Sequence, residues 1–311
     1  MRPSLAPPAA PWRARLRERL GASRLRFDVP LRPLTTLRIG GPADCLVDLE
    51  SEEDLQALFQ VIREAALPFL VLGKGSNVLV GDAGLRGVAI RLGRAFSGFR
   101  SAGAPGLVRA GAGLADAAFV EEARALGLGG MEFLVAIPGT IGGAIAMNAG
   151  AHSGETARFL TAARWFEMAT GTIRDAPTAD FAFAYRRSPL RAGEGCLVLE
   201  GAFRLEPTAD AEIQARKAYF QAWRREHQPR DFPNCGSVFK NPPGQAAARL
   251  IDDAGLKGHR QGDAQVSEKH ANFIVNRGQA TARDVLELID FIRDTIYKRT
   301  GHQLELELEV V

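Results

Sequence analysis

The most informative segment of the sequence is IPGTIGGAIAMNAG, residues 137–150. Pro138 can start a turn and Thr140 can cap a helix, although a helix built from so many small residues is a poor one in isolation. It therefore needs a second element packed against it. Its glycines permit the close approach of another backbone or of a flat ring, and the free N–H groups at its start favour a phosphate. A tightly packed core helix is the alternative interpretation.

A second glycine-rich segment, GKGSN at residues 73–77, directly follows a strand-like run at 68–72. Glycines in such a turn let backbone N–H groups approach an anion, as a diphosphate requires. The segment is not a Walker A loop, because Pro68 stands where the first glycine should be, and Val78 replaces the third glycine of a Rossmann fingerprint. Taken alone it reads as an ordinary turn between strands. Two segments that can each face an anion favour a dinucleotide site.

Length and composition limit the class of protein. The chain has 311 residues, which predicts two domains with a core large enough to need no disulfide or metal. Fractions of 46% apolar and 24% charged residues argue against disorder, collagen-like repeats and a coiled coil. The net charge of +3 is too balanced to indicate a nucleic-acid partner, whereas small anionic ligands are compatible with it.

Cysteine spacing and the apolar runs bear on location. Cys45, Cys196 and Cys235 lie far apart, so we expect neither a disulfide framework nor a metal site, and a reducing cytoplasm fits. The apolar stretch 134–149 is broken by proline and glycine and is shorter than the ~20 residues of a spanning helix, so we expect no membrane anchor. Residues 1–24 lack the apolar region of a signal peptide, and we expect a flexible basic tail with one short helix.

Strand-like and helical patterns along the chain predict an α+β protein. The expected strands lie at 45–49, 68–72, 88–92, 107–110 and 196–205, with a hairpin around 165–173. The expected helices are one capped by Ser51 with Leu55, Leu58, Val61 and Ile62 on one face, and others at 116–126, 209–227 and 281–300. Residues 303–311 alternate like a strand. The change of character near residue 207 predicts one domain over 25–206 and a second over 207–311.

Several motifs resemble, in order and spacing, those of the UDP-N-acetylenolpyruvoylglucosamine reductase family. They are TLRIGGPA at 36–43, the two glycine segments, Tyr185-Arg186, CGSVFKNP at 235–242 and LELE at 304–307. The resemblance covers nearly everything after residue 30 and is to the shorter, second type of the family. It implies an FAD-binding fold of the vanillyl-alcohol-oxidase type in two lobes, followed by a smaller C-terminal α+β substrate domain. It also implies synthesis of UDP-N-acetylmuramate, a peptidoglycan precursor.

By the same resemblance the glycine segments hold FAD without a covalent bond. The residues implied are Gly73, Lys74, Gly75, Ser76, Asn77, Pro138, Gly139, Thr140, Gly142, Gly143, Asn148 and Gly150. His152 is the nearby residue that could tether a flavin covalently in other flavoproteins of this fold, and we interpret it as a surface or loop histidine. NADPH is the implied reductant.

The resemblance assigns catalysis to Arg186, Ser237 and Glu307. Hydride passes from flavin N5 to C3 of the enolpyruvyl group, and Ser237 delivers a proton to C2. A guanidinium fork suits a carboxylate that becomes enolate-like. Without the motif, Arg186 would read as a surface ion pair, with Arg187 as the alternative. Period-two spacing alone does not separate Glu307 from its neighbours, because 305, 307 and 309 share one face of a strand that could simply be solvated.

Lys240 and Asn241 are the candidates for contacts to the substrate diphosphate or sugar, and Tyr185 for packing on either ligand. The expected partner is a small UDP-sugar, with no nucleic acid and no membrane, and the expected state is a monomer. Two alternatives stay open: an oxidase of the same fold acting on another substrate, and a non-catalytic flavin-binding protein. Ser237 argues against the oxidase, because oxidation of an alcohol needs a base rather than a proton donor.

Overall fold

Four strands and two helices form the first lobe of the computed structural model, which describes residues 11–311. The sheet has the order β1-β2-β5-β3, in which β1 is antiparallel to β2 and the other neighbours are parallel. Its strands are β1 (Leu25–Pro30), β2 (Pro42–Leu49), β3 (Phe69–Val71) and β5 (Leu85–Leu92). Helix α2 (Glu52–Glu64) begins at Ser51, whose side chain accepts a hydrogen bond from the N–H of Asp54, and buries the four apolar residues expected to share one face.

Residues 11–24 are packed onto this lobe. Helix α1 (Pro11–Leu20) buries Leu16 and Leu20 in the core that α2 also covers, and η1 (Ala22–Arg24) leads into β1. An ion pair joins Arg13 to Asp28 at 2.8 Å. The sequence predicts a flexible tail over residues 1–24, but residues 11–24 are packed against the lobe. Two leucines one turn apart hold the basic helix there. Residues 1–10 of that tail lie outside the described residues.

A five-stranded antiparallel sheet forms the second lobe, with the order β12-β11-β13-β7-β6. Its strands are β6 (Phe99–Ser101), β7 (Leu107–Gly111), β11 (Leu160–Glu167), β12 (Thr172–Pro177) and β13 (Cys196–Arg204). Helix α4 (Ile141–Ala146) carries the small residues of the 137–150 segment. A Cβ on Gly142 would lie 2.8 Å from the Cβ of Ala112, so this glycine lets α4 approach the end of β7. The structure thus contains both the helix and the close backbone contact that the 137–150 segment predicts.

The remaining elements of this lobe connect the sheet to α4 and to the next domain. They include α3 (Asp116–Ala125), η4 (Glu132–Ala136), η5 (Thr156–Arg158), η6 (Thr178–Asp180) and η7 (Ala192–Glu194). Two short ladders pair β8 (Leu128–Gly129) with β14 (Glu206–Pro207) and β9 (Gly150–Ala151) with β10 (Gly154–Glu155). In the first lobe, η2 (Arg32–Leu34) and η3 (Arg94–Phe96) play the same connecting role.

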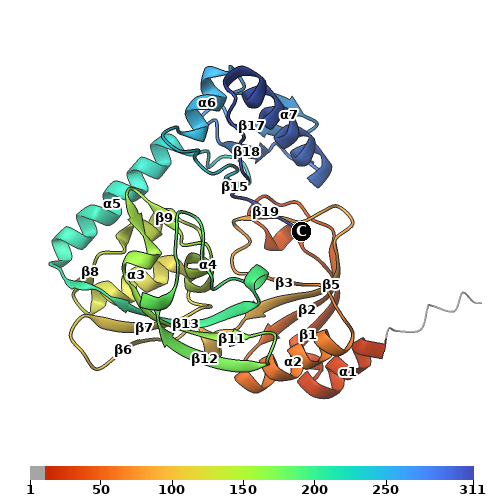
Figure 1. Cartoon of the computed structure of the whole chain (residues 1–311), viewed down its shortest axis with the longest axis vertical. Coiled ribbons are helices and arrows are strands. Elements are labelled where there is room, and N and C mark those ends of the chain that lie inside the picture. Colours follow the sequence, from red (N-terminus) through yellow and green to blue (C-terminus); the bar gives the residue numbers. More distant parts are fainter. Residues whose placement is uncertain (1–10) are drawn as a thin grey trace, which may run out of the picture.

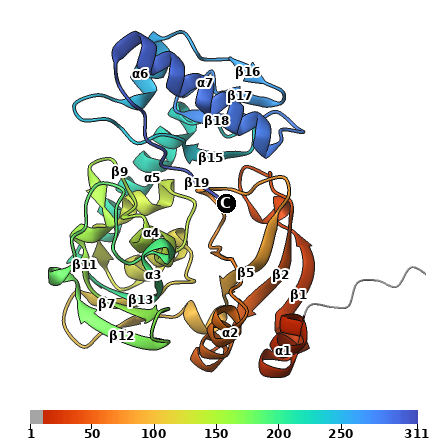
Figure 2. The same cartoon turned by 45° about the vertical axis from the view of Figure 1, so that its right-hand side comes forward.

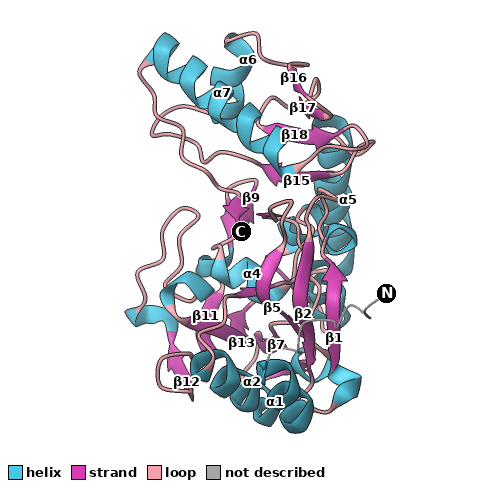
Figure 3. Ribbon diagram, turned by 90° about the vertical axis from the view of Figure 1, so that its right-hand side faces the viewer, coloured by secondary structure: helices cyan, strands magenta, loops and turns pink. Residues whose placement is uncertain are grey.

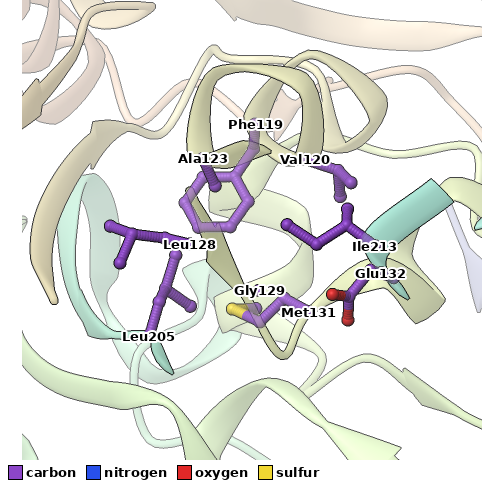
Figure 4. A pocket seen from close by; sticks show the side chains of 9 residues that line it. All are labelled: Phe119, Val120, Ala123, Leu128, Gly129, Met131, Glu132, Leu205 and Ile213. Atoms are coloured by element: carbon purple, nitrogen blue, oxygen red, sulfur yellow. The ribbon is translucent and has the colours of Figure 1, made fainter. Parts of the chain in front are cut away.

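The long helix α5 (Asp210–His227) runs along the outside of the second lobe toward the C-terminal domain (Figure 1). Ile213 enters a small apolar cavity of about 10 Å³ between α3 and η4, together with Phe119 and Met131 (Figure 4). The apolar residues of this helix are only partly buried: Tyr219 is 59% exposed, and Lys217 is buried in its place against Glu121. The helix thus shares the core of the second lobe, while the boundary at 207 stays a prediction.

The C-terminal domain stacks on both lobes, with α6 and α7 on one side of a four-stranded sheet (Figures 2 and 3). The sheet has the order β15-β18-β17-β16. Its elements are β15 (Asn234–Ser237), α6 (Ala247–Asp253), β16 (Arg260–Gln261), β17 (Ala264–Val266), β18 (Phe273–Asn276) and α7 (Ala282–Thr300). The predicted limits of α7 are confirmed, since Thr281 and Asp284 form a capping box and Gly301 ends the helix with φ 75°.

Residues 304–311 lead the chain back to the first lobe. Leu306 forms a bridge with Phe239, and β19 (Glu309–Val310) pairs in parallel with β4 (Val78–Leu79). The expected regular strand is interrupted at Glu307. The N–H groups of Glu307 and Leu308 both donate to the carbonyl of Val238, at 2.9 and 3.3 Å, which is the pattern of a β-bulge. The prediction that three glutamates share one face is therefore wrong.

Candidate active site

The two glycine segments lie side by side, as predicted. A Cβ on Gly73 would lie 2.9 Å from Oγ1 of Thr140, which joins the 73–77 loop to the start of α4. Gly75 has φ 61°, and a Cβ there would collide with the carbonyl oxygen of Leu34, so the turn requires glycine. Thr140 caps α4 by accepting from the N–H of Gly143 at 3.4 Å.

These loops offer backbone donors to an anion. The N–H groups of residues 73–77, Gly139 and Thr140 donate no backbone hydrogen bond within the part of the chain that the structure describes. Lys74 is exposed beside them and adds a positive charge. The N–H of Gly142 is already taken by the carbonyl of Ala112, so its contribution is close approach and not donation. Unpaired donors converging from two loops fit a diphosphate.

Arg186 sits at the tip of a tight turn from the second lobe. Ala184 and Arg187 exchange two backbone hydrogen bonds of 3.0 Å, which leaves Tyr185 and Arg186 as the two turn residues, and Arg186 has φ 53°. Its Nε donates to Oε1 of Glu307 at 2.6 Å and its Nη2 to the carbonyl of Gly150 at 2.7 Å. The guanidinium therefore joins the 137–150 segment to residue 307, far along the chain.

The structure brings Glu307, of the three candidate glutamates, to Arg186. The bulge turns its side chain inward, so that it is 14% exposed, whereas that of Glu305 is 74% exposed. Burial raises the pKa of Glu307, and the adjacent Arg186 guanidinium opposes that rise. Asn77 of the first glycine segment donates from Nδ2 to the carbonyl oxygen of Glu307 at 3.0 Å. A loop residue assigned to FAD thus holds the backbone of a residue assigned to catalysis.

The backbone of Ser237 lies next to that of Glu307. It precedes Val238, whose carbonyl accepts the N–H of Glu307. Between Asn234 and Ser237 the pairing of β15 with β18 shifts register, and Gly236 takes up the extra residue with φ 77°. No atom of the described residues lies within 4 Å of the place where a Cβ of Gly236 would be. This open space supports the expectation that a substrate can approach the Ser237 hydroxyl.

The three substrate candidates gather where the second lobe meets the C-terminal domain. The exposed Tyr185 receives a hydrogen bond on its hydroxyl from the N–H of Asn241, at 3.4 Å. Lys240 pairs with the exposed Glu305 at 3.3 Å, an ion pair that an anionic ligand can replace at little cost. Oδ1 of Asn241 accepts from the N–H of Ala247, the first residue of α6, at 3.0 Å. The carbonyl end of that side chain has a structural role that the sequence did not reveal.

The side chain of Asn148, a residue expected near the flavin, forms its hydrogen bonds within the protein. Its side chain is buried, and Nδ2 donates to the carbonyl of Ala184 at 3.0 Å and to Glu155 at 3.2 Å, while Oδ1 accepts from the N–H of Ala157 at 2.9 Å. Both N–H groups of the amide are therefore used within the protein. The amide holds the base of the turn that carries Arg186.

His152 occupies the turn between β9 and β10, with φ 52°. Its ring packs against two aromatic residues of α5, with centroid distances of 4.8 Å to Phe220 and 4.6 Å to Trp223. Burial lowers the pKa of this histidine, which favours the neutral ring. These contacts agree with its interpretation as a loop histidine.

Asp116 has an unusual environment that the sequence does not indicate. It is the first residue of α3, and its carboxyl group is buried against Gly139 of the second glycine segment. Burial raises the pKa of Asp116 to about 8. An acid in the first turn of a helix is the ordinary choice, because it complements the helix dipole, so the sequence pattern gave no sign of a special position.

The N-terminal and C-terminal parts of the chain each match a known protein family. The model of an FAD binding domain matches residues 43–176, and the model of the UDP-N-acetylenolpyruvoylglucosamine reductase C-terminal domain matches residues 228–311. A reductase of this name from Geobacter metallireducens is 46% identical over 301 residues, which are 96% of this chain and 97% of that one. The chain belongs to the UDP-N-acetylenolpyruvoylglucosamine reductase family. Its predicted family is thereby confirmed.

Further relatives of the family agree in length and fold. UDP-N-acetylenolpyruvoylglucosamine reductase 2 of Symbiobacterium thermophilum is 45% identical over 92% of both chains. The crystal structure of the Thermus caldophilus reductase superposes with a TM-score of 0.78 at 40% identity and covers 92% of this chain and 99% of that one. Together with the FAD binding domain match, this confirms the predicted α+β class and the FAD-binding fold.

Within residues 11–311, no helix combines the length and the apolar character needed to cross a bilayer. In the same residues, His, Cys, Asp and Glu form no group of three or more that could hold a metal ion.

Proposed function

We propose that this chain reduces the enolpyruvyl ether of UDP-N-acetylglucosamine to UDP-N-acetylmuramate, with FAD as cofactor and NADPH as reductant. The observation that carries the proposal is the Arg186–Glu307 pair, held beside Ser237 and tied through Asn77 to the loop with unpaired backbone donors. Family membership supports the same substrate. The proposed activity belongs to the synthesis of the bacterial cell wall.

The residues present fit FAD. The unpaired N–H groups of residues 73–77 and 139–140 would hold its diphosphate, with Lys74 nearby, and the exposed Gly143 allows close approach at the start of α4. When bound, FAD takes up a hydride from NADPH and supplies it to C3 of the enolpyruvyl group. All further steps fall to side chains of this chain.

Arg186 binds the substrate carboxylate in this proposal. Two of its five N–H groups are used by Glu307 and Gly150, and the others have no hydrogen-bond partner among residues 11–311, so they can bind an anion. Negative charge grows on the carboxylate as C3 is reduced, and a fixed guanidinium stabilises that charge without reorganising. Glu307 and the Gly150 carbonyl fix the orientation of the arginine before substrate arrives.

Ser237 delivers the proton to C2, which completes the addition across the double bond. A serine hydroxyl is a weak acid, so the resulting alkoxide needs nearby positive charge or a proton relay. Arg186 and Lys240 supply positive charge on this side of the site. The buried Glu307, whose raised pKa eases protonation, shares the handling of the enol with Arg186.

Stopped-flow absorbance of the holoenzyme tests the proposal. NADPH alone should bleach the bound flavin, and the enolpyruvyl substrate should restore its absorbance under anaerobic conditions. A preparation that NADPH does not bleach refutes the reductase. Bleached flavin that only oxygen re-oxidises would support an oxidase acting on another substrate instead.

Three further parts of the proposal concern the whole chain. We propose an FAD-binding part over 25–206 with a substrate domain over 207–311, a cytoplasmic location and a monomeric state. Cys45, Cys196 and Cys235 are all free thiols, which fits a reducing compartment. Light scattering of the purified chain tests the monomer, since a mass near twice 33.5 kDa would refute it.

A further inference from the structure

The carboxyl group of Asp116 is buried and has no hydrogen-bond partner among residues 11–311. The residue is 1% exposed, and both Oδ1 and Oδ2 are buried without a partner among the residues that the structure describes. Buried polar groups in native proteins are nearly always paired, so an unpaired carboxyl group needs an explanation. None of the roles assigned above uses it.

The position of this carboxyl group relates it to the cofactor loop. The N–H of Asp116 donates to the carbonyl of Gly139 at 3.1 Å, and the preceding Ala115 forms a bridge with Thr140. A Cβ placed on Gly139 would collide with Oδ2 of Asp116. The acid therefore lies directly behind the segment whose unpaired N–H groups face the proposed diphosphate.

Few charges act on Asp116. Burial raises its pKa to about 8, and Lys74 of the neighbouring glycine loop is the charge that opposes this rise. Of the elements packed against α3, β8 and α4 contain no titratable side chain, and η4 contains Glu132, whose carboxylate accepts from the N–H of Gly130. The protonation state of Asp116 is thus set by burial, by Lys74 and by whatever anion occupies the loop.

We propose that Asp116 is a proton-linked gate for the cofactor: its carboxyl group must be protonated while a diphosphate lies on the Gly139 loop, and its ionisation weakens binding of that diphosphate. The inference rests on the proposed placement of FAD. A carboxylate behind the loop would place a negative charge near a dianion in a poorly hydrated environment, where like charges repel strongly. A neutral acid there is compatible with the bound anion.

The coupling between proton binding and FAD binding determines how the affinity for FAD changes with pH. The protein binds diphosphate best with the proton on Asp116, so affinity is constant below the pKa of the free site and falls above it. With that pKa at about 8, the dissociation constant for FAD should rise about tenfold between pH 7 and pH 9. Lys74 acts in the opposite direction, because its positive charge favours ionised Asp116.

The test measures release of FAD from the holoenzyme. Diluted wild-type protein and the Asp116→Asn variant are compared from pH 6 to pH 9.5 by the fluorescence of free FAD. We expect the tenfold rise in the wild type and none in the variant, which is isosteric and cannot ionise. A rise of equal size in both, or no rise in the wild type, overturns the proposal.

A second variant and a direct measurement guard against a folding defect in Asp116→Asn. Lys74→Gln should weaken FAD binding at every pH, yet shift the alkaline rise to higher pH, which a merely structural Asp116 would not do. Infrared difference spectra recorded as FAD is released between pH 7 and pH 9.5 should show loss of one protonated-carboxyl band in the wild type. Absence of that band refutes the proposal. Failure of the wild type to hold FAD even at pH 7 would refute the proposed function as well.

Discussion

Replacing Asn148 should damage catalysis without removing the cofactor. Asn148→Ala removes three hydrogen bonds and leaves the carbonyl of Ala184 and the N–H of Ala157 without their partner. Each buried group left unpaired costs about 1–3 kcal/mol. Asn148 also has φ 41°, where alanine costs about 1 kcal/mol more than asparagine or glycine. We expect a loss of about 3–7 kcal/mol in the free energy of unfolding.

The catalytic effect follows from what the amide supports. Ala184 starts the turn that carries Arg186, so loosening it should lower the rate of flavin re-oxidation by substrate and leave its reduction by NADPH unchanged. Urea unfolding and the two half-reactions in stopped flow measure both effects. Asn148→Gly is the matched control, because it removes the same hydrogen bonds but relieves the backbone. It should recover about 1 kcal/mol of stability and none of the lost rate.

Two results would contradict this reasoning. A loss of bound flavin in Asn148→Ala, with normal chemistry in the fraction that stays loaded, would return Asn148 to the cofactor-binding role that its motif implies. Equal slowing of both half-reactions would show that the amide supports the whole site and not the Arg186 turn.

Four other changes test separate parts of the structure. Ser237→Ala should leave reduction by NADPH almost intact and slow re-oxidation by the enolpyruvyl substrate by several orders of magnitude; equal losses would reject the proton-donor role. Glu307→Gln should slow the same half-reaction and remove any limb of its pH profile that this carboxyl group governs. Leu16→Ala, at a fully buried position of α1, should cost about 2–5 kcal/mol in urea unfolding, whereas Glu18→Ala on the exposed face should change little. The pKa of Asp116 in the folded protein lies above its unfolded value, so the protein loses stability as the pH rises. Relative to Asp116→Asn, the free energy of unfolding of the wild type should fall by about 1.4 kcal/mol per pH unit between pH 5 and 8. Parallel stability profiles of the two proteins would refute the assignment.

Local signals in the sequence were sufficient for the elements and for much of the site. Ser51 and Thr281 cap helices where the pattern of polar and apolar residues predicts them. Gly75 adopts φ 61° in its turn, a backbone conformation that favours glycine. These features depend on a few neighbouring residues and on backbone geometry, which a single sequence displays directly.

The rest depends on contacts between distant segments. The choice of Glu307 over Glu305 follows from a bulge opposite Val238, and neither the bulge nor its partner is visible in a period-two pattern. Burial of Lys217 in place of Tyr219 follows from the way α5 lies on the second lobe, with Glu121 opposite the lysine. Asp116 looks like an ordinary helix start until Gly139 is placed against it. Sequence periodicity describes one segment at a time, so it cannot predict such pairings.

The link between Asn77 and Glu307 also has a consequence for biosynthesis. These residues are 230 positions apart, and the adjoining strands β4 and β19 pair in parallel. At about 5–20 residues per second, a ribosome needs about 10–50 s to pass from one to the other. For that interval the edge of β4 lacks its partner while much of the nascent chain has already emerged. We therefore expect the cofactor to bind stably only after this last strand has been made, and chaperones to protect the exposed edge until then.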